Sequence, residues 1–525
     1  MIKKFNILLL SLLLILTGCQ SSSADKPESK AVYYQVFVGS FYDSDNDGIG
    51  DLQGIISKLD YLEKDLGVSG IWLSPIHPSP TYHKYDVSDY YDIDRDFGTL
   101  EDFKQLANEL KSRDMDLMMD LVFNHTSSLH PWFIQAKSAV LNDECDEVEV
   151  CDYYNFSDTF DAGYTKLSNG TYYESQFWSE MPDLNLDNKD VRNEIANIAS
   201  YWIDLGVNAF RLDATTHFYE NKISQNTEVL NWFNDEVKSI DENIYVVGEA
   251  WTNKSIIFDM YESGIDSFFN FEFSQNDGRI TKSINTKKGA NLASAVYDYN
   301  KDLKAKNPEA IDAVFLSNHD NGRSAGYFAN QLDKQKIAAS IYLLMPGTSF
   351  VYYGEEIGML GSGVDENKRL PMQWGSSEDK NIPKRYPGAD YKDFEIDSVS
   401  DQVKNKDSLL AHYQQVIQVK NRYPQLKDGD LSVVNLECSE VYGLRHDDLI
   451  VLHNLSDQEV EISIDGKVVE KILSKNDIKD GKLVMDGFST FIIMDNNEKG
   501  RWLNGKYVRC SEIGWSRDFN CVKGY

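Results

Sequence analysis

The sequence predicts an α/β fold: a (β/α)8 TIM barrel with an inserted subdomain after its third strand and a C-terminal antiparallel β-sandwich domain. From residue 31 onward, short apolar runs alternate with helical patterns, which is typical of a parallel sheet. This alternation is interrupted only between residues 126 and 188. After residue 425 it gives way to short alternating strands separated by turns such as Asp465-Gly466, which indicates an antiparallel domain.

The barrel prediction depends on finding eight strands with helices between them. The predicted strands are Val32–Phe41, Gly70–Leu73, Asp116–Phe123, Ala209–Leu212, Ile244–Val247, Ile265–Phe269, Ala313–Leu316 and Ser349–Tyr352. The predicted helices include Leu52–Leu66, Phe103–Arg113, Val191–Leu205, Thr227–Ser239 and Ser408–Arg422. Eight right-handed βα units close into a barrel. We therefore expect the barrel over residues 31–125 and 189–425, and we read 126–188 as an inserted domain because so long an irregular stretch is uncommon.

The remaining segments flank this barrel. Residues 426–495 are predicted to form the β-domain, with strands at Leu449–Leu452, Glu459–Ile464 and Thr490–Ile493. The tail 496–525 is rich in Trp, Gly and Cys, and its role does not follow from the sequence.

The N-terminus has the pattern of an export signal. Lys3 and Lys4 precede an apolar run over residues 7–16, which is too short to span a bilayer comfortably. The run ends in Leu16-Thr-Gly-Cys19, which resembles a bacterial lipobox. We expect residues 1–18 to be a signal peptide, Cys19 to carry lipid, and residues 19–30 to tether an extracytoplasmic protein to the membrane. The alternative is an ordinary signal peptide with an incidental cysteine.

Composition narrows the range of partners. The formal net charge of −32 argues against nucleic acid, because phosphate binding needs clustered lysine and arginine. Export permits disulfides, and the simplest local pairing joins Cys145 to Cys151 and Cys510 to Cys521, leaving Cys438 free. Sequence alone cannot fix this connectivity. We expect a monomer.

Carboxylates follow several predicted strands, where barrel enzymes keep their functional groups. The third strand ends in Asp120-Leu-Val-Phe-Asn-His125 and the fourth in Phe210-Arg-Leu-Asp213-Ala, with His217 close behind. The fifth is followed by Gly248-Glu249-Ala-Trp251, and the seventh by Asn318-His319-Asp320. Any one of these acids could be a helix cap or a surface charge. Together, they predict carboxylates that converge at one face of the barrel.

These four segments resemble the signature regions of the α-amylase family, glycoside hydrolase family 13, in the family's order and spacing over residues 31–495. The resemblance implies that Asp213 is the nucleophile, Glu249 the general acid/base and Asp320 the stabiliser of the transition state. It also implies that the substrate is an α-glucan, that Arg211 keeps Asp213 ionised, and that His125, His217 and His319 contact the sugar.

The chemistry of glycosidic cleavage explains why carboxyl groups with a neighbouring arginine are needed at such a site. It needs two carboxyl groups in different protonation states, about 5–5.5 Å apart in retaining enzymes. Arg211 lies on the same side of its strand as Asp213, so its charge should lower the pKa of Asp213. Glu249 must be protonated near neutrality, so its surroundings should raise its pKa.

Two further segments agree with the resemblance. Tyr82-His83-Lys-Tyr85-Asp86 is similar to a family segment that surrounds the bound glucose, which places His83, Tyr85 and Asp86 there, with Tyr85 as a stacking platform. Met181-Pro-Asp-Leu-Asn185 resembles the family's fifth region in members intermediate between oligo-1,6-glucosidases and neopullulanases.

An acidic loop follows the first strand and has the spacing of a Ca²⁺ loop. Asp43, Asp45, Asp47 and Asp51 occupy positions 1, 3, 5 and 9, Gly48 is at position 6, and Ile49 offers its carbonyl at position 7. Position 12 is Gly54, so the loop is not an EF-hand. Because the family carries a similar calcium loop, we expect structural Ca²⁺ here; the alternative is a plain acidic turn.

Specificity is less well determined. Ala214 follows the nucleophile, and a small residue there is similar to members that cleave α-1,4 bonds, whereas valine is typical of α-1,6 specificity. Typical amylases carry Lys-His where this sequence has Thr216-His217, which leaves exo-acting α-glucosidase, oligo-1,6-glucosidase or a maltogenic or transglycosylating enzyme as alternatives. Two further alternatives are more remote: an enzyme with trehalose synthase chemistry and a non-catalytic sugar-binding homologue. The non-catalytic homologue is remote because all three carboxylates are present in this sequence.

Overall fold

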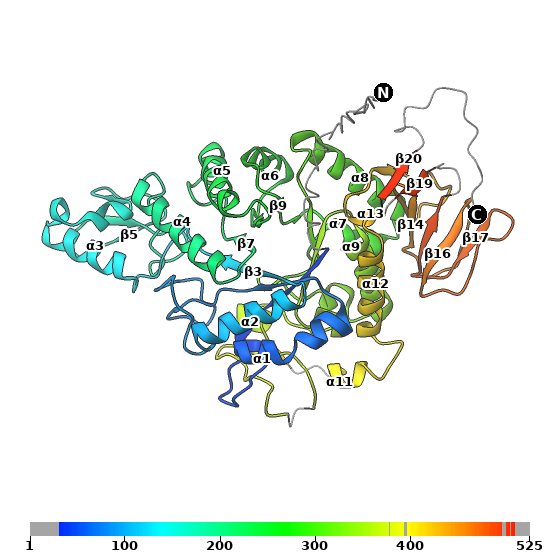
Figure 1. The fold of residues 1–525 in the computed structure, drawn as a ribbon, viewed down its shortest axis with the longest axis horizontal. Coiled ribbons are helices and arrows are strands. Elements are labelled where there is room, and N and C mark those ends of the chain that lie inside the picture. The colour runs from blue at the N-terminus through cyan, green and yellow to red at the C-terminus, as the bar shows by residue number, and fades with distance from the viewer. Residues whose placement is uncertain (1–30, 377–378, 393–395, 496–499, 504–505, 510–525) are drawn as a thin grey trace, which may run out of the picture.

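A computed structural model describes residues 31–376, 379–392, 396–495, 500–503 and 506–509. The predicted signal peptide, Cys19, the tether and the Cys510–Cys521 pair lie outside these residues. No helix in the described ranges is long and apolar enough to cross a membrane. In Figure 1 the inserted segment and the C-terminal β-domain lie at opposite ends of the long axis, with the barrel between them.

Eight parallel strands form the barrel, as predicted. They are β1 Val32–Val36, β2 Gly70–Leu73, β3 Asp116–Leu121, β7 Ala209–Leu212, β8 Tyr245–Gly248, β9 Ser267–Phe268, β10 Ala313–Phe315 and β11 Thr348–Tyr352. From β1 to β9 each barrel strand pairs with the next along the chain, β10 pairs with β11, and β11 returns to β1. A parallel bridge between Phe269 and Ala313 joins the remaining two edges, β9 and β10.

Large side chains from these strands fill the barrel interior. One buried cluster takes a member from every strand or its end, including Tyr33, Trp72, Met118, Phe269 and Phe350. The rings of Tyr33 and Phe350 stack with centroids 5.3 Å apart. The interior is therefore a packed core, which leaves ligand binding to the strand ends.

Helices surround the barrel. The main ones are α1 Leu52–Ser57, α2 Leu100–Ser112, α4 Lys189–Asp204, α5 Ile223–Ile240, α6 Lys254–Met260, α7 Arg279–Thr286, α8 Gly289–Lys306, α9 Leu332–Leu344 and α12 Leu409–Arg422. Short helices are α10 Asp365–Lys368, α11 Val399–Gln402 and α13 Gln425–Asp428, with single turns at Val38–Ser40, Tyr61–Leu66, Tyr261–Ser263, Ser324–Phe328 and Glu355–Ile357. Helix α2 shows why such segments form: Thr99 and Asp102 make a reciprocal capping box, and Phe103, Leu106 and Leu110 bury one face.

Several predicted elements end a few residues away from their predicted bounds, and two differ more than that. The first strand ends at Val36 rather than Phe41, because Val38–Ser40 form a 3₁₀ turn in which Phe41 N donates to Val38 O. The helix predicted over Leu52–Leu66 is divided into α1 and a π-type turn at Tyr61–Leu66. Gly67 N donates to Leu62 O across five residues, and this wider turn keeps Leu62 and Leu66 buried together.

The inserted segment between β3 and α4 forms a small subdomain. It contains α3 Pro131–Asn142, turns at Cys145–Glu147 and Glu149–Tyr153, and a three-stranded antiparallel sheet of β4 Phe156–Ser157, β5 Tyr164–Lys166 and β6 Tyr172–Glu174. The predicted Cys145–Cys151 disulfide is present, and Cys438 is free as predicted.

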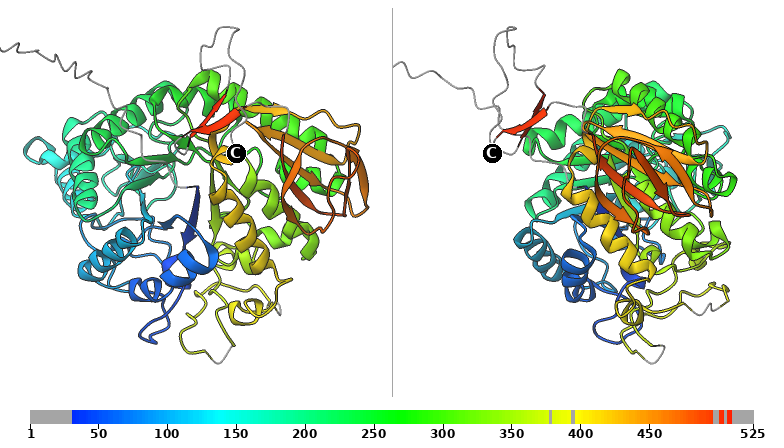
Figure 2. Two further views of the ribbon diagram at one scale, coloured as in Figure 1. Left: turned by 45° about the vertical axis from the view of Figure 1, so that its right-hand side comes forward. Right: turned by 90° about the vertical axis from the view of Figure 1, so that its right-hand side faces the viewer.

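The C-terminal domain consists of antiparallel sheets, as predicted. A five-stranded sheet contains β12 Leu431–Val433, β13 Val441–His446, β14 Leu449–Asn454, β16 Lys467–Ile472 and β18 Thr490–Met494, and a two-stranded sheet pairs β15 Val460–Ser463 with β17 Lys482–Met485. Ile462 and Leu483 share a core with Leu452 and Phe491 of the larger sheet. Figure 2 shows this domain beside α12. In the tail, β19 Gly500–Leu503 pairs with β20 Lys506–Arg509.

Candidate active site

The three carboxylates that follow strands β7, β8 and β10 line one cavity. Asp213, Glu249 and Asp320 surround a space of about 300 Å³ together with Tyr85 and His125. His217 also lines it, with Nδ1 2.8 Å from Glu220 Oε2. The carboxyl ends of adjacent parallel strands meet at one rim of a barrel, which brings residues more than a hundred positions apart into one cleft.

Arg211 is not part of the cavity lining and links the carboxylates of the site. Its Nη1 donates to Asp213 Oδ1 and, at 2.8 Å, to Asp120 Oδ1, while its Nη2 lies 3.6 Å from Glu249 Oε2. The guanidinium is 1% exposed, so water screens these interactions weakly. A single buried cation therefore holds Asp213 and Glu249 close to each other.

Glu249 has the properties of a proton donor. Burial raises its pKa to about 7, and the negative charges of Asp213 and Asp320 act in the same direction, whereas Arg211 opposes them. The N–H of Ala214 donates to Glu249 Oε2 at 2.9 Å. Thr215 fixes the main chain through a 2.7 Å bond from its hydroxyl to Glu249 O. Glu249 is thus oriented by the loop after β7 and is partly protonated at neutral pH.

Asp320 is held in the opposite protonation state. Burial alone would raise its pKa, but His319 and Arg369 together keep the pKa of Asp320 below its ordinary value. Arg369 Nη2 lies 3.1 Å from Oδ1, and His319 Nε2 lies 3.0 Å from Oδ2. His319 is fully buried, and burial lowers its own pKa. Because Gln35 Nε2 lies 2.7 Å from its Nδ1, we assign the ring proton to Nε2.

Tyr85 forms one wall of the cavity. Its hydroxyl donates to Asp120 Oδ2 at 3.1 Å, and its ring stacks on His319 with centroids 5.5 Å apart. His125 Nε2 lies 3.2 Å from Tyr85 O. This network fixes the position of the Tyr85 ring at the cavity wall.

Four of the sequence-predicted substrate residues do not line this cavity: His83, Asp86, Arg211 and His319. His83 Nδ1 accepts a bond from Tyr85 N at 3.1 Å, which positions the Tyr85 main chain. Asp86 is fully buried and accepts bonds from Ser79 and Thr81. Their direct contact with sugar stays a prediction, and in this structure they support the cavity wall.

The structure also brings in residues that sequence reasoning did not select. Phe177 and Met181 of the inserted subdomain and Trp251 after β8 line the cavity. The Phe177 ring packs 5.0 Å from His217 and 5.4 Å from His125. Phe177 and Trp251 are 47% and 52% exposed, which is unusual for large aromatic residues. Trp251 could have been suspected because it lies two residues after Glu249; Phe177 carries no comparable sequence signal.

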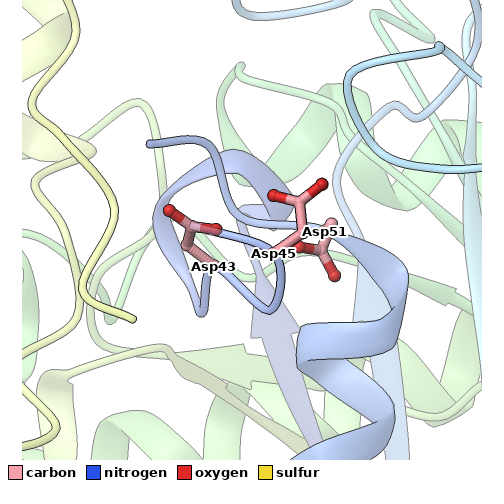
Figure 3. Close-up of side chains that lie close together, drawn as sticks. All are labelled: Asp43, Asp45 and Asp51. Carbon is pink, nitrogen blue, oxygen red and sulfur yellow. The ribbon is translucent and has the colours of Figure 1, made fainter. Parts of the chain in front are cut away.

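The predicted metal loop lies between β1 and α1, and Figure 3 shows three of its carboxylates together. Asp43, Asp45 and Asp51 place oxygen atoms within 4.8 Å of one another. Asp47 is not part of this group, and its carbonyl accepts a 3.2 Å bond from Lys384. Burial and the nearby Asp47 and Asp45 raise the pKa of Asp43. A buried carboxylate among like charges and an all-oxygen donor set fit Ca²⁺.

Comparison with known proteins agrees with this geometry. Residues 35–429 match the model of the family described as "Alpha amylase, catalytic domain". The chain is 37% identical to "Alpha-amylase 3" of Dictyoglomus thermophilum, covering 88% of this chain and 93% of that protein. It is 31% identical to "Glucan 1,6-alpha-glucosidase" of Streptococcus pneumoniae, covering 86% and 95%.

A solved structure, "Eubacterium rectale Amy13B", superposes with a TM-score of 0.86 at 39% identity and covers 89% of this chain and 95% of its own. A family match over most of the chain, with this fold and three converging carboxylates, identifies the protein as a glycoside hydrolase of the α-amylase family.

Proposed function

We propose that this glycoside hydrolase is an α-amylase that cleaves α-1,4-glucosidic bonds in starch-like glucans and retains the anomeric configuration. The observation that carries the proposal is the pairing of Asp213 and Glu249 at one guanidinium. Retention requires two carboxyl groups close enough for one to attack the anomeric carbon while the other protonates the leaving oxygen.

The mechanism follows from the protonation states. Asp213 attacks the anomeric carbon while Glu249 gives its proton to the glycosidic oxygen, so the C–O bond breaks and a glucosyl–enzyme ester forms. Glu249, now ionised, takes a proton from water, and the resulting hydroxide displaces Asp213. Asp320 stays ionised beside Arg369, and its negative charge favours the positive oxocarbenium-like transition state.

Ala214 supports the preference for α-1,4 bonds. It lines the cavity beside the nucleophile and has φ of 50°, in the left-handed region. A β-branched residue would be strained there and would narrow the cleft. Its small side chain matches the pattern of α-1,4-cleaving members.

A second candidate is oligo-1,6-glucosidase activity. Two relatives with that printed name, from Parageobacillus thermoglucosidasius and Bacillus cereus, are 29% and 28% identical to this chain. The threonine at position 216, where typical amylases have lysine, is consistent with this alternative because it removes a charged contact from the cavity.

Product analysis separates these candidates. The mature protein is incubated with amylose, pullulan, isomaltose and maltose, and the products are resolved by size and anomeric form, with Asp213→Asn as the inactive control. An α-amylase releases α-anomeric maltooligosaccharides of several lengths from amylose and leaves isomaltose intact. Rapid isomaltose cleavage would favour the second candidate, and early β-anomers would exclude retention.

We also propose that the loop at residues 43–51 binds structural Ca²⁺, with Asp43, Asp45 and Asp51 as carboxylate ligands. Asp47 and the carbonyl of Ile49 stay candidates from the spacing alone. The ion would neutralise like charges and hold the loop against its neighbours. No step of the reaction involves this loop.

The location of the enzyme is a separate proposal. The Leu16-Thr-Gly-Cys19 motif supports a lipid anchor on Cys19 at the outer side of a bacterial membrane, from which a monomer would reach its glucan. Labelled fatty acid should enter the expressed protein and should fail to enter Cys19→Ser. Equal labelling of both proteins would refute the anchor.

A further inference from the structure

The segment between strand β2 and helix α2 supplies one wall of the catalytic cavity without regular structure of its own. Residues 74–99, all of which the structure describes, form no helix or strand, yet Tyr85 from this segment lines the cavity beside Asp213 and Asp320. Loops of this length without secondary structure are uncommon and are often functional. The backbone that carries Tyr85 is therefore held by tertiary contacts.

Lys84, directly before Tyr85, combines two unfavourable features. Its φ is 65°, in the left-handed region, where a residue with a Cβ atom is strained. Its side chain is also buried, with the residue only 6% exposed, although lysine is almost never buried unless it is paired. Strained backbone persists only where the surroundings enforce it, and such positions cluster at functional sites.

A buried ion pair holds Lys84 in this conformation. Its Nζ lies 2.7 Å from Asp94 Oδ2, and the two side chains are 7% and 8% exposed, so water screens the pair weakly. The same carboxylate accepts bonds from Ser79 N at 3.2 Å and from Asp96 N at 3.0 Å. The pair therefore connects the turn at Lys84 to the backbone on both sides of it.

Tyr85 contacts the charge networks of two active-site carboxylates. Its hydroxyl donates to Asp120 Oδ2 at 3.1 Å and lies 2.6 Å from His319 Nε2. Asp120 accepts a bond from the guanidinium that also holds Asp213, and His319 Nε2 lies 3.0 Å from Asp320 Oδ2. A displacement of the Tyr85 hydroxyl would therefore disturb the partners of both Asp213 and Asp320.

We propose that Lys84 is a positioning residue: its ion pair with Asp94 holds the strained turn that places the Tyr85 hydroxyl between Asp120 and His319. Lys84 does not line the cavity, so it acts through Tyr85 and makes no contact with the substrate. The inference rests on the proposed α-glucan hydrolysis and deepens it by assigning a role in that reaction to a residue outside the cavity.

The test separates positioning from folding, with kcat on maltoheptaose measured at a temperature where circular dichroism shows every variant folded. Lys84→Met leaves Asp94 as a buried charge without a cation, so it should lower both the melting temperature and kcat. Lys84→Met/Asp94→Asn removes both charges, so its melting temperature should return towards that of wild type. Its kcat should nevertheless stay about 10- to 100-fold below wild type, the scale of effect that a small misplacement has on catalysis.

Coupling to Tyr85 shows whether Lys84 acts through that residue. Tyr85→Phe removes the hydroxyl that contacts Asp120 and His319 but keeps the ring. If Lys84 places that hydroxyl, adding Lys84→Met/Asp94→Asn to Tyr85→Phe should lower kcat by a factor about three or more times smaller than in the wild-type background. An equal factor in both backgrounds would overturn the inference, because a structural role independent of Tyr85 gives additive effects.

Lys482→Met/Glu461→Gln is the matched control. This pair in the β-domain is equally short, at 2.6 Å, but its side chains are 59% and 53% exposed, and exposed pairs contribute little to stability. The control should keep the wild-type melting temperature and kcat. If wild type hydrolyses maltoheptaose and Lys84→Met/Asp94→Asn is equally active, the inference fails while the proposed hydrolysis stands. If wild type does not hydrolyse maltoheptaose, the proposed function fails and the inference fails with it.

Discussion

At the residue scale, the site gives similar carboxyl groups different roles through their partners. Glu249 has two acidic neighbours in a buried setting, and its pKa rises to about 7. Asp320 lies beside His319 and Arg369, and its pKa falls. These opposite shifts suit the proposed roles of Glu249 as the acid and Asp320 as the charged stabiliser, although neither role can be recognised from the residue type alone.

This difference predicts an alkaline limit to activity. The pKa of Glu249 is raised above its ordinary value, so the protonated acid is present below about pH 7 and is lost as the pH rises through it. The pH profile of kcat on maltoheptaose should therefore fall above about pH 7. Glu249→Gln should lower kcat about 10²- to 10⁴-fold, the usual contribution of a general acid. A wild-type profile that stays flat to pH 9 would contradict this assignment.

At the element scale, the barrel and the β-domain pack closely against each other at the start of helix α8. Gly289 begins this helix, and Ala290 N donates to Ser439 O at 3.1 Å. A Cβ atom at position 289 would lie 2.3 Å from Tyr442 N and 2.4 Å from Glu440 O. Both are backbone atoms, so the close contact can be relieved only by moving the helix or strand β13.

We therefore expect Gly289→Ala to destabilise the protein by about 1–3 kcal/mol, the typical cost of overpacking. Thermal unfolding measures the loss. Gly326→Ala is the control, because its added Cβ would meet nothing closer than Leu360 Cδ2 at 3.9 Å. Equal melting temperatures for wild type and Gly289→Ala would show that this junction can relax.

At the scale of the whole molecule, the proposed calcium loop connects distant parts of the chain. Asp43 N donates to Asn381 O at 2.9 Å, and Asn381 Nδ2 donates back to Asp43 O at 2.7 Å. Lys384 N donates to Gly48 O at 2.8 Å. The loop after the first strand is thereby tied to a segment that follows the eighth, so ordering the loop should stabilise the closed barrel.

Calcium should accordingly raise the melting temperature, and EDTA should lower it. Binding to the folded state alone contributes about 2.7 kcal/mol at a calcium concentration a hundred times Kd. Because protons compete for the raised-pKa carboxyl of Asp43, the stabilisation should weaken as the pH falls. Asp45→Asn should abolish the calcium response, whereas Asp235→Asn, at an exposed position on α5, should keep it. An unchanged response in Asp45→Asn would refute the site.

The sequence by itself determined the features that depend on local periodicity and spacing. Strands β2 and β7 have the predicted boundaries, and the Cys145–Cys151 pairing is as predicted. The sequence also predicted which acids follow successive strands, because each acid lies within a few residues of an apolar run. Such patterns depend only on neighbouring residues, so they can be recognised without knowledge of the fold.

Only the tertiary structure decided what surrounds those acids. Barrel closure buries Arg211 among carboxylates from three strands, and the inserted subdomain brings Phe177 to the cleft. Protonation states and cavity shape depend on burial and on contacts between residues far apart in sequence, and these exist only once the chain has folded.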